Sequence, residues 1–130
     1  MSLKIEGTIP GFKNHYHFHA SPKYRANIFT EKIAVRAKEL FLEKAEELNW
    51  NILDIAVDND HVHFLIESNS TPSDIAQRLF GFTSFALRKD FPELKNLNKE
   101  HFWGGRQCKC ITDEEHLTNT LKYIAKHKNI

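Results

Sequence analysis

The order in which the hydrophobic period changes along this chain constrains its fold more than any other feature. Alternating apolar residues predict strands, whereas apolar residues spaced three or four apart predict helices. Two β-rich segments flank Asp58-Asn59-Asp60, whose residues favour a tight turn, so a hairpin is predicted there. In chain order, the predicted elements are a strand at 15–20, a helix at 30–48, strands at 50–57 and 61–67, a helix at 71–90, a strand at 101–111 and a helix that starts around Thr112.

This order is typical of the ferredoxin-like split βαβ arrangement. In that α+β fold two helices back an antiparallel sheet, and here one extra helix follows at the C-terminus. The chain has 130 residues, of which 41% are hydrophobic, including 10 Phe and 2 Trp, enough for one core. We therefore expect a single domain over residues 1–130, and we assign no role to residues 1–3, which could be a cloning remnant.

The same periods predict which side chains face the core. Tyr16 and Phe18 share the inner face of the first strand, and Thr30 is placed to cap the first helix. The remaining residues predicted to face inward are Val62, Phe64 and Ile66 in the hairpin, Ile33, Ala37, Leu40, Phe41, Lys44 and Leu48 on one stripe of the first helix, Ile75, Leu79, Phe82, Phe85 and Ala86 in the second, and Leu117, Leu121 and Ile124 in the last.

No apolar run approaches the roughly 18 residues that a membrane span needs, and the N-terminus lacks a signal-peptide pattern. We therefore expect a cytoplasmic protein without a membrane partner. Its two cysteines, Cys108 and Cys110, are one residue apart, a spacing that suits neither a loop-closing disulfide nor a zinc knuckle, so we expect reduced, structural thiols.

The net charge of +1 conceals a segregation of charge along the chain. Residues 31–67 carry 4 basic and 9 acidic side chains, whereas residues 78–110 carry 7 basic and 3 acidic ones. If the basic segments meet in the fold they form a face for polyanions, although lysines that merely solvate the surface give the same counts. The candidate DNA-binding residues are Lys13, Lys23, Arg25, Arg78, Arg88, Arg106, Lys122 and Lys126.

Histidines recur at two-residue spacing in two of the predicted strands. Residues i and i+2 of a strand project from the same face, so His61 and His63 could offer two imidazoles to one metal ion. A pair of hydrogen-bonded structural histidines explains the spacing equally well. For His15, His17 and His19 we favour a strand face turned toward solvent or DNA over a metal site.

Tyr123 and His127 lie one turn apart on the last helix and so share a face. A tyrosine hydroxyl beside a metal ligand would place a nucleophile next to a Lewis acid. The alternative is a tyrosine that packs against the sheet with its hydroxyl in water.

Taken together, these residues resemble the single-tyrosine HUH transposases of the insertion-sequence 200/605 group (IS200-like). The resemblance covers nearly the whole chain, and the order of its motifs is more specific than any one of them. The matching segments are Ser21-Pro22-Lys23-Tyr24-Arg25, Asp60-His61-Val62-His63-Phe64-Leu65-Ile66, Thr71-Pro72, Phe102-Trp103-Gly104-Gly105 and Tyr123-Ile124. HUH denotes two histidines around a hydrophobic residue, here His61-Val62-His63.

The resemblance implies a DNA transposase that cleaves and rejoins single-stranded DNA through a 5′-phosphotyrosine on Tyr123. His61, His63 and His127 would ligate a divalent metal, Mg²⁺ or Mn²⁺, although three histidines would also suit Zn²⁺ or Ni²⁺. His127 stands where the family commonly has Gln or Asn. The partners implied are single-stranded DNA with hairpin ends and a second copy of the chain, whose histidines would receive the tyrosine helix.

Two other classes of protein share these features. A non-catalytic RNA- or single-stranded-DNA-binding module could use the same sheet, with Tyr16, Phe18 or Trp103 stacking on bases. A small metal-dependent hydrolase could use the three histidines around a water molecule. A covalent adduct between Tyr123 and DNA is expected only of the transposase.

Overall fold

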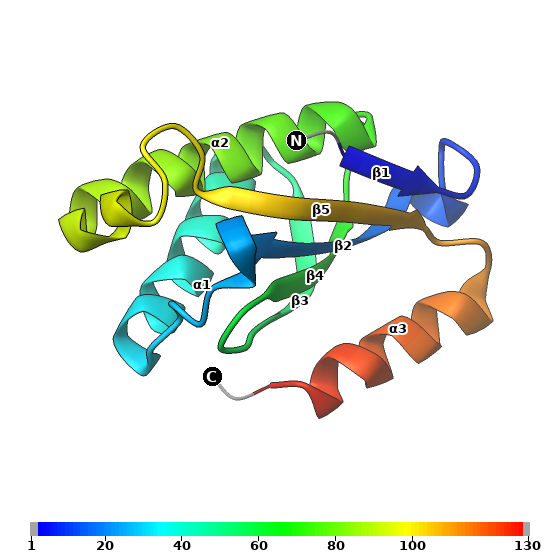
Figure 1. The fold of residues 1–130 in the computed structure, drawn as a ribbon. Helices are drawn as coiled ribbons and strands as arrows, with labels where there is room; N and C mark the ends of the chain where they lie inside the picture. Colours follow the sequence, from blue (N-terminus) through cyan, green and yellow to red (C-terminus); the bar gives the residue numbers. More distant parts are fainter. Residues whose placement is uncertain (1–2, 129–130) are drawn as a thin grey trace.

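A computed structural model describes residues 3–128 and shows an α+β fold of one five-stranded sheet and three helices (Figure 1). The strands are β1 (Leu3–Glu6), β2 (His15–Pro22), β3 (Asn51–Val57), β4 (Val62–Glu67) and β5 (Trp103–Cys110). The helices are α1 (Glu31–Glu47), α2 (Pro72–Asp90) and α3 (Glu114–Lys126), and the short 3₁₀ turns are η1 (Phe12–Asn14), η2 (Lys23–Arg25) and η3 (Pro92–Asn96).

The sheet has the strand order β1-β5-β2-β4-β3, with β2 at its centre. β2 runs antiparallel to both β4 and β5, and β3 and β4 form the predicted hairpin. The ferredoxin-like prediction is therefore confirmed, with one difference. β1 adds a fifth strand, parallel to β5, which makes the sheet mixed. The four residues of β1 are too few for a hydrophobic period to predict a strand. They form one because they pair with the edge of β5.

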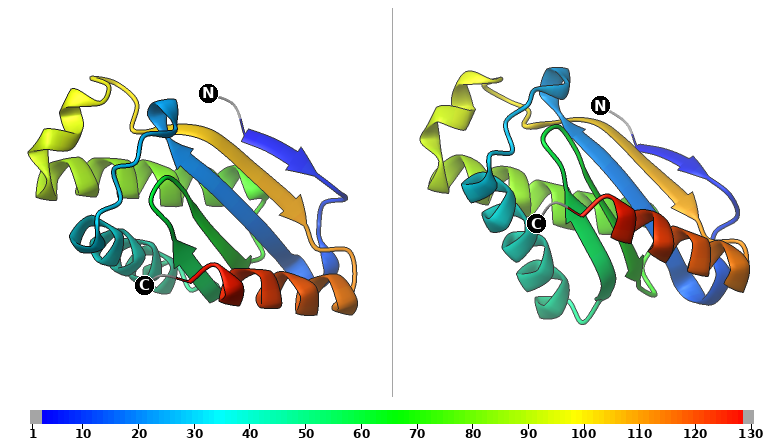
Figure 2. Two further views of the ribbon diagram at one scale, coloured as in Figure 1. Left: turned by 60° about the horizontal axis from the view of Figure 1, so that its bottom comes forward. Right: turned by 90° about the horizontal axis from the view of Figure 1, so that it is seen from below.

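The helices lie in two layers on opposite faces of the sheet (Figure 2). α1 and α2 back one face, where the main core includes Phe18, Phe41, Phe64 and Phe80. α3 crosses the other face, where Ile124 packs with a smaller buried cluster from β3 and β4. The expected arrangement of two backing helices and one C-terminal helix is thus confirmed.

Side-chain caps fix the start of each helix. Thr30, as predicted for α1, and Thr71 of α2 each accept a hydrogen bond from the backbone N–H three residues later. In α3 the cap is Asp113, whose carboxylate accepts from the backbone N–H of His116 at 2.8 Å. An aspartate cap also complements the positive end of the helix dipole.

The inner face of α2 differs from the prediction. Phe85 is 65% exposed, whereas Thr83 is fully buried in its place. Apolar residues occupy two sides of this helix, so the sequence alone does not say which side faces the sheet. The buried threonine is satisfied because its hydroxyl donates to the Leu79 carbonyl at 2.8 Å and accepts from the indole N–H of Trp103 at 3.1 Å.

Cys108 and Cys110 are buried and unbridged, and burial raises the pKa of both thiols. Within residues 3–128, no helix is long and apolar enough to cross a membrane.

Candidate active site

Adjacent strands bring four histidines onto the face of the sheet that α3 covers. β2 pairs with β4 so that His19 lies opposite His63, and His17 and His61 lie one step to either side on the same face. The His19 and His61 rings stack at 5.0 Å between centroids, and the His61 and His63 rings lie 5.5 Å apart. His17 reaches His63 at 5.9 Å, which makes His63 the centre of the group.

α3 adds a tyrosine and a fifth imidazole to this group. The Tyr123 ring lies 5.2 Å from that of His63 and 5.9 Å from that of His17. His127, one helical turn later, is 4.3 Å from Tyr123 and 5.6 Å from His63. The structure thus brings together His61, His63, Tyr123 and His127, which the sequence analysis predicted as three metal ligands and a nucleophile.

All four residues belong to one chain, because α3 is docked on its own sheet. Ile124, next to the tyrosine, is fully buried, and Lys128 forms an ion pair with Asp54 of β3 at 2.5 Å. We expected the exposed face of this helix to reach the histidines of a partner. In this chain Tyr123 lies against its own His63, so no second copy is needed to assemble the group.

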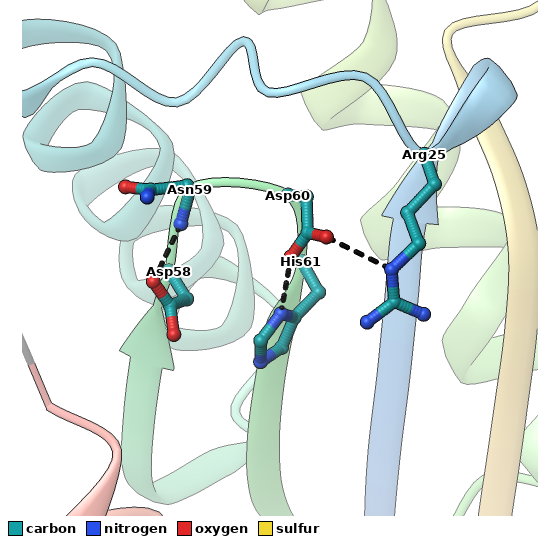
Figure 3. Close-up of polar contacts among 5 residues, drawn as sticks. All are labelled: Arg25, Asp58, Asn59, Asp60 and His61. Atoms are coloured by element: carbon teal, nitrogen blue, oxygen red, sulfur yellow. Dashed lines mark hydrogen bonds and ion pairs between the residues drawn. The ribbon is translucent and has the colours of Figure 1, made fainter.

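His61 is held by a chain of two charged contacts at the β3–β4 turn (Figure 3). Its Nδ1 donates to Asp60 at 2.8 Å, and the other carboxylate oxygen of Asp60 pairs with Nε of Arg25 at 2.8 Å. The hydrogen bond from His61 and then the pairing with Arg25 lower the pKa of Asp60, which keeps this carboxylate ionised. With Nδ1 committed as a donor, the Nε2 of a neutral His61 is free to act as a ligand.

The other rings near Tyr123 also present nitrogens to the site. His127 Nδ1 donates to the Tyr123 carbonyl at 2.8 Å, which leaves its Nε2 as the ligating atom of the neutral ring. Both ring nitrogens of His63 and the Nε2 of His17 are buried without a hydrogen-bond partner among the described residues. Buried polar atoms normally have partners, so these three nitrogens mark a place for a ligand.

Burial keeps three of the histidines neutral. Loss of solvent lowers the pKa of His63 to about 3 and the pKa of both His17 and His19 to about 4, and the neighbouring imidazoles lower each of them further. At neutral pH these rings therefore carry no charge. The neutral imidazole is the form that binds metal ions.

The donor set fits a metal ion in its chemistry, although the rings are not yet gathered around one point. Within the described part of the chain, no three His, Cys, Asp or Glu side chains are grouped as closely as metal ligands are. His63 has two unpartnered ring nitrogens, and the His61 and His127 rings, each with its Nε2 free, lie 5.5 and 5.6 Å from the His63 ring between centroids. Imidazole suits Zn²⁺, Ni²⁺ and similar ions, whereas harder cations such as Mg²⁺ and Mn²⁺ prefer oxygen ligands.

A cavity of about 430 Å³ opens beside the tyrosine. It is lined by His17, His19, Gln107, Lys109, His116, Asn119, Thr120 and Tyr123. Sequence reasoning did not select Lys109, an exposed cation in this wall, or Asn119 on α3. The alternation of β5 could have selected Lys109, because it shares a strand face with Gln107, but the pairing of β5 with the histidine strand was needed to show its importance.

The histidines of β2 are less exposed than expected. His15 is buried and its Nδ1 donates to the Phe12 carbonyl at 3.2 Å, so the expectation of a face turned toward solvent or DNA is wrong for this residue. His17 and His19 are half-buried beneath α3 and line the cavity. The sequence pattern of these two histidines is that of a solvated strand face, and only the packing of α3 shows that they are partly covered.

The eight predicted DNA-binding cations do not gather on one face. Lys23 and Arg25 lie in η2, directly after the C-terminal end of β2. Lys122 and Lys126 lie on α3, on either side of Tyr123 in the sequence. Arg78 pairs with Asp74 on α2. The remaining three lie apart from the histidines: Lys13 in η1, Arg88 tied to Ser84 and to the Lys99 carbonyl, and Arg106 beside α2 in a different pocket.

Comparisons with known proteins agree with this architecture. A crystal structure of a protein from Deinococcus radiodurans R1, described as a transposase, superposes with a TM-score of 0.70 at 19% identity, covering 96% of this chain and 98% of that one. A structure of a REP-associated tyrosine transposase bound to a REP hairpin superposes with a TM-score of 0.65 at 14% identity, covering 100% of this chain and 76% of that one. No curated protein matches the sequence significantly.

The sequence itself matches the profile of one family, described as "Transposase IS200 like", over residues 11–127. This match includes every strand and helix except β1, and it includes all of the histidines and the tyrosine of the site. The chain therefore belongs to the IS200-like transposase family.

Proposed function

We propose that this transposase cleaves and rejoins single-stranded DNA through a covalent 5′-phosphate bond to Tyr123. The observation that supports this proposal most is the position of Tyr123, whose ring lies 5.2 Å from His63 and 4.3 Å from His127 within one chain. Its side chain is 43% exposed, so a strand can reach it from the cavity beside it.

The residues of the site have separate roles in the proposed reaction. The oxygen of Tyr123 attacks the phosphorus, an O–P bond forms, and the bond from phosphorus to the 3′ oxygen breaks. The phenol loses a proton and the departing 3′ oxygen gains one, so a free 3′ hydroxyl remains. Because the phosphodiester is retained on the tyrosine, attack by a 3′ hydroxyl reverses the step without an external source of energy.

His61, His63 and His127 would hold a divalent cation, with Mg²⁺ or Mn²⁺ proposed for phosphate chemistry. When bound, such an ion supplies a Lewis acid that stabilises the charge developing on phosphate oxygens. Asp60 orients His61 for this task, while Lys109, Lys122 and Lys126 lie where they could attract the strand. Because one structural neighbour is a tyrosine transposase bound to a REP hairpin, we propose that the DNA substrate carries folded hairpin ends.

The homodimer implied by the sequence resemblance stays a prediction. Since α3 packs on its own sheet, each chain of such a dimer would carry a complete group of histidines and tyrosine.

A covalent adduct tests the proposal. The protein is incubated with Mn²⁺ and single-stranded DNA from the ends of its own element, and a denaturing gel is read for a protein–DNA band. We expect the band with the wild type, its loss in Tyr123→Phe, and its retention in Tyr16→Phe, which removes a buried hydroxyl on the opposite face of the sheet. A band that persists in Tyr123→Phe would assign the nucleophile elsewhere.

A further inference from the structure

The turn Lys23–Arg25, at the end of β2, has features that the proposed chemistry leaves unused. Tyr24 and Arg25 both adopt left-handed backbone conformations, with φ of 64° and 49°. Residues with side chains rarely take these angles, and such positions tend to occur where a turn presents its side chains for binding. The Tyr24 side chain is 71% exposed, the highest value among the large hydrophobic and aromatic residues of the described chain.

Several contacts hold this exposed tyrosine in place. The Lys23 backbone N–H donates to the Phe102 carbonyl at 2.7 Å, which ties the turn to the segment before β5. The Asn98 amide donates to the Tyr24 hydroxyl at 3.3 Å, so the ring is fixed at its outer end. The Lys23 ammonium lies 5.8 Å from the centre of the same ring. The turn therefore offers a preorganised aromatic surface with a cation beside it.

A pocket of about 360 Å³ lies between this turn and the start of β5. Its walls are Ser21, Pro22, Lys23, Tyr24, Arg25, Gly104 and Gly105. A Cβ added at Gly104 would lie 2.9 Å from the Pro22 carbonyl oxygen, whereas one added at Gly105 would meet no atom within 4 Å. The first glycine thus allows the turn to approach β5, and the second leaves space open in the pocket.

The pocket adjoins the histidine site. Arg25 uses its Nε to pair with Asp60, which in turn accepts from His61 (Figure 3). A guanidinium has five N–H donors, so this pairing leaves donors for a phosphate. Along β5, Gly105, Gln107 and Lys109 are all exposed, and the last two line the cavity beside Tyr123. A strand that reaches Tyr123 can therefore continue to the turn.

We propose that this pocket is a nucleotide subsite, in which Tyr24 stacks on an unpaired base of single-stranded DNA next to the cleaved phosphate. Lys23 and Arg25 contact the adjoining phosphates. The combination of an exposed, fixed aromatic ring and two cations matches how proteins bind single strands, with stacking that tolerates any base and a positive groove for the backbone. The inference builds on the proposed function, because it places the subsite beside that site.

Equilibrium binding in a non-cleaving background tests the subsite apart from the chemistry. Tyr123→Phe protein is titrated, with a chelator present, with single-stranded oligonucleotides that carry 2-aminopurine at successive positions. We expect fluorescence quenching at one or two positions, and we expect Tyr24→Ala to abolish it and to weaken binding roughly 5- to 100-fold. Tyr24→Phe, which keeps the aromatic face, should retain both properties, and Leu42→Ala on acidic α1 serves as the control.

Two further variants sharpen the test. Gly105→Val should narrow the pocket and weaken binding, and because the added Cβ has no atom within 4 Å we expect little change in the thermal unfolding temperature. Lys23→Ala should reduce the dependence of log Kd on log salt concentration by about 0.7, the value for one phosphate contact on a single strand.

The possible failures are distinguishable. Tyr24→Ala protein that binds within about 2-fold of its parent, with the same quenching profile, would overturn the subsite even if the wild type forms the covalent adduct. Binding that depends on Tyr24 in a protein that never forms the adduct would support the subsite and overturn the proposed cleavage.

Discussion

At the scale of single residues, the two histidines of the HUH motif are held differently. His61 is fixed by the Asp60 carboxylate, whereas both ring nitrogens of His63 are buried without a partner among the described residues. A carboxylate bonded to the non-ligating nitrogen of a histidine fixes its tautomer and orientation. The sequence predicted both histidines, but their unequal surroundings depend on the turn geometry and on Arg25, 35 residues earlier in the chain.

Loss of Asp60 should therefore weaken metal binding. We expect Asp60→Ala to raise the Kd for Mn²⁺ by about 10- to 100-fold in isothermal titration calorimetry, the usual effect of removing such a partner. Asp60→Asn should retain part of the affinity, because its amide oxygen still accepts from His61. Asp90→Ala, which removes an aspartate paired with Arg36 in the same geometry away from the site, is the matched control. Equal affinities for Asp60→Ala and this control would contradict the orienting role.

The three desolvated histidines should make the protein sensitive to mild acid. Their pKa values are about 3 to 4 in the native state, against 6.5 for an unperturbed histidine, so below pH 6.5 the unfolded chain takes up protons that the native state excludes. The free energy of unfolding should therefore fall as the pH drops from about 6.5 to 4. Asp60, whose pKa is lowered by its hydrogen bonds with His61 and Arg25, contributes little in this window.

Urea titrations across this range, with a chelator present, measure the effect. His17→Gln should reduce the loss of stability between pH 6.5 and 4, since one of the three groups no longer titrates. His101→Gln, at an exposed loop position, should leave the loss unchanged. A wild-type urea midpoint that does not fall over this range would show that the histidines are solvated.

At the scale of elements, the docking of α3 decides whether the site exists. The helix has its apolar contact with the sheet at Ile124, which is fully buried, and Leu117 and Leu121 pack beside it. Its periodicity predicted this face correctly. The periodicity did not predict that this face covers the histidines of the same chain. The apolar stripe of an amphipathic helix can pack on its own sheet or on the sheet of a partner equally well.

Ile124→Ala should loosen this helix. We expect a loss of about 2–5 kcal/mol in the free energy of unfolding, the usual cost of truncating a buried isoleucine. Adduct formation should decrease in parallel, because Tyr123 is the preceding residue. Thr118→Ala, on the exposed side of α3, should change stability by less than about 0.5 kcal/mol. Wild-type stability in the Ile124 variant would mean that α3 does not pack on this sheet.

The other elements show where sequence patterns suffice. The hairpin, α1 and β5 were predicted within a few residues, because their periods and caps are local properties. The prediction that Phe85 lies on the inner face of α2 was wrong. Apolar residues occupy two sides of this helix, and its packing on the sheet decides which side is buried. β1 was missed because its pairing with β5 joins residues about 100 positions apart.

At the scale of the whole molecule, the sheet brings together residues that are distant in the sequence. β2, β4 and α3 contribute one part of the site each, and the central position of β2 places its histidines beside those of β4. The register between these strands, with His19 opposite His63, cannot be deduced from residue spacing. The candidate ligands His61, His63 and His127 and the candidate nucleophile Tyr123 could therefore be predicted from the sequence. The structure was needed to show that His17, His19 and Lys109 lie beside them.

A site within one chain predicts the outcome of mixing variants. Tyr123→Phe protein has intact histidines, and His61→Ala/His63→Ala protein has an intact tyrosine. Because each tyrosine lies against its own histidines, mixtures should form no more adduct than the separate proteins, even when subunit exchange is demonstrated independently. Recovery of cleavage in the mixture would show that α3 reaches a partner chain.

The most direct measurement of the central claim locates the DNA on the protein. After reaction with single-stranded DNA and Mn²⁺, the adduct is digested with nuclease and protease, and mass spectrometry identifies the modified peptide. The chain has 3 tyrosines, and Tyr24 is more exposed than Tyr123, at 71% against 43%, so accessibility alone would favour the wrong residue. We predict a nucleotide phosphate on Tyr123 and none on Tyr24 or Tyr16; modification of Tyr24, or of no tyrosine, would contradict the account.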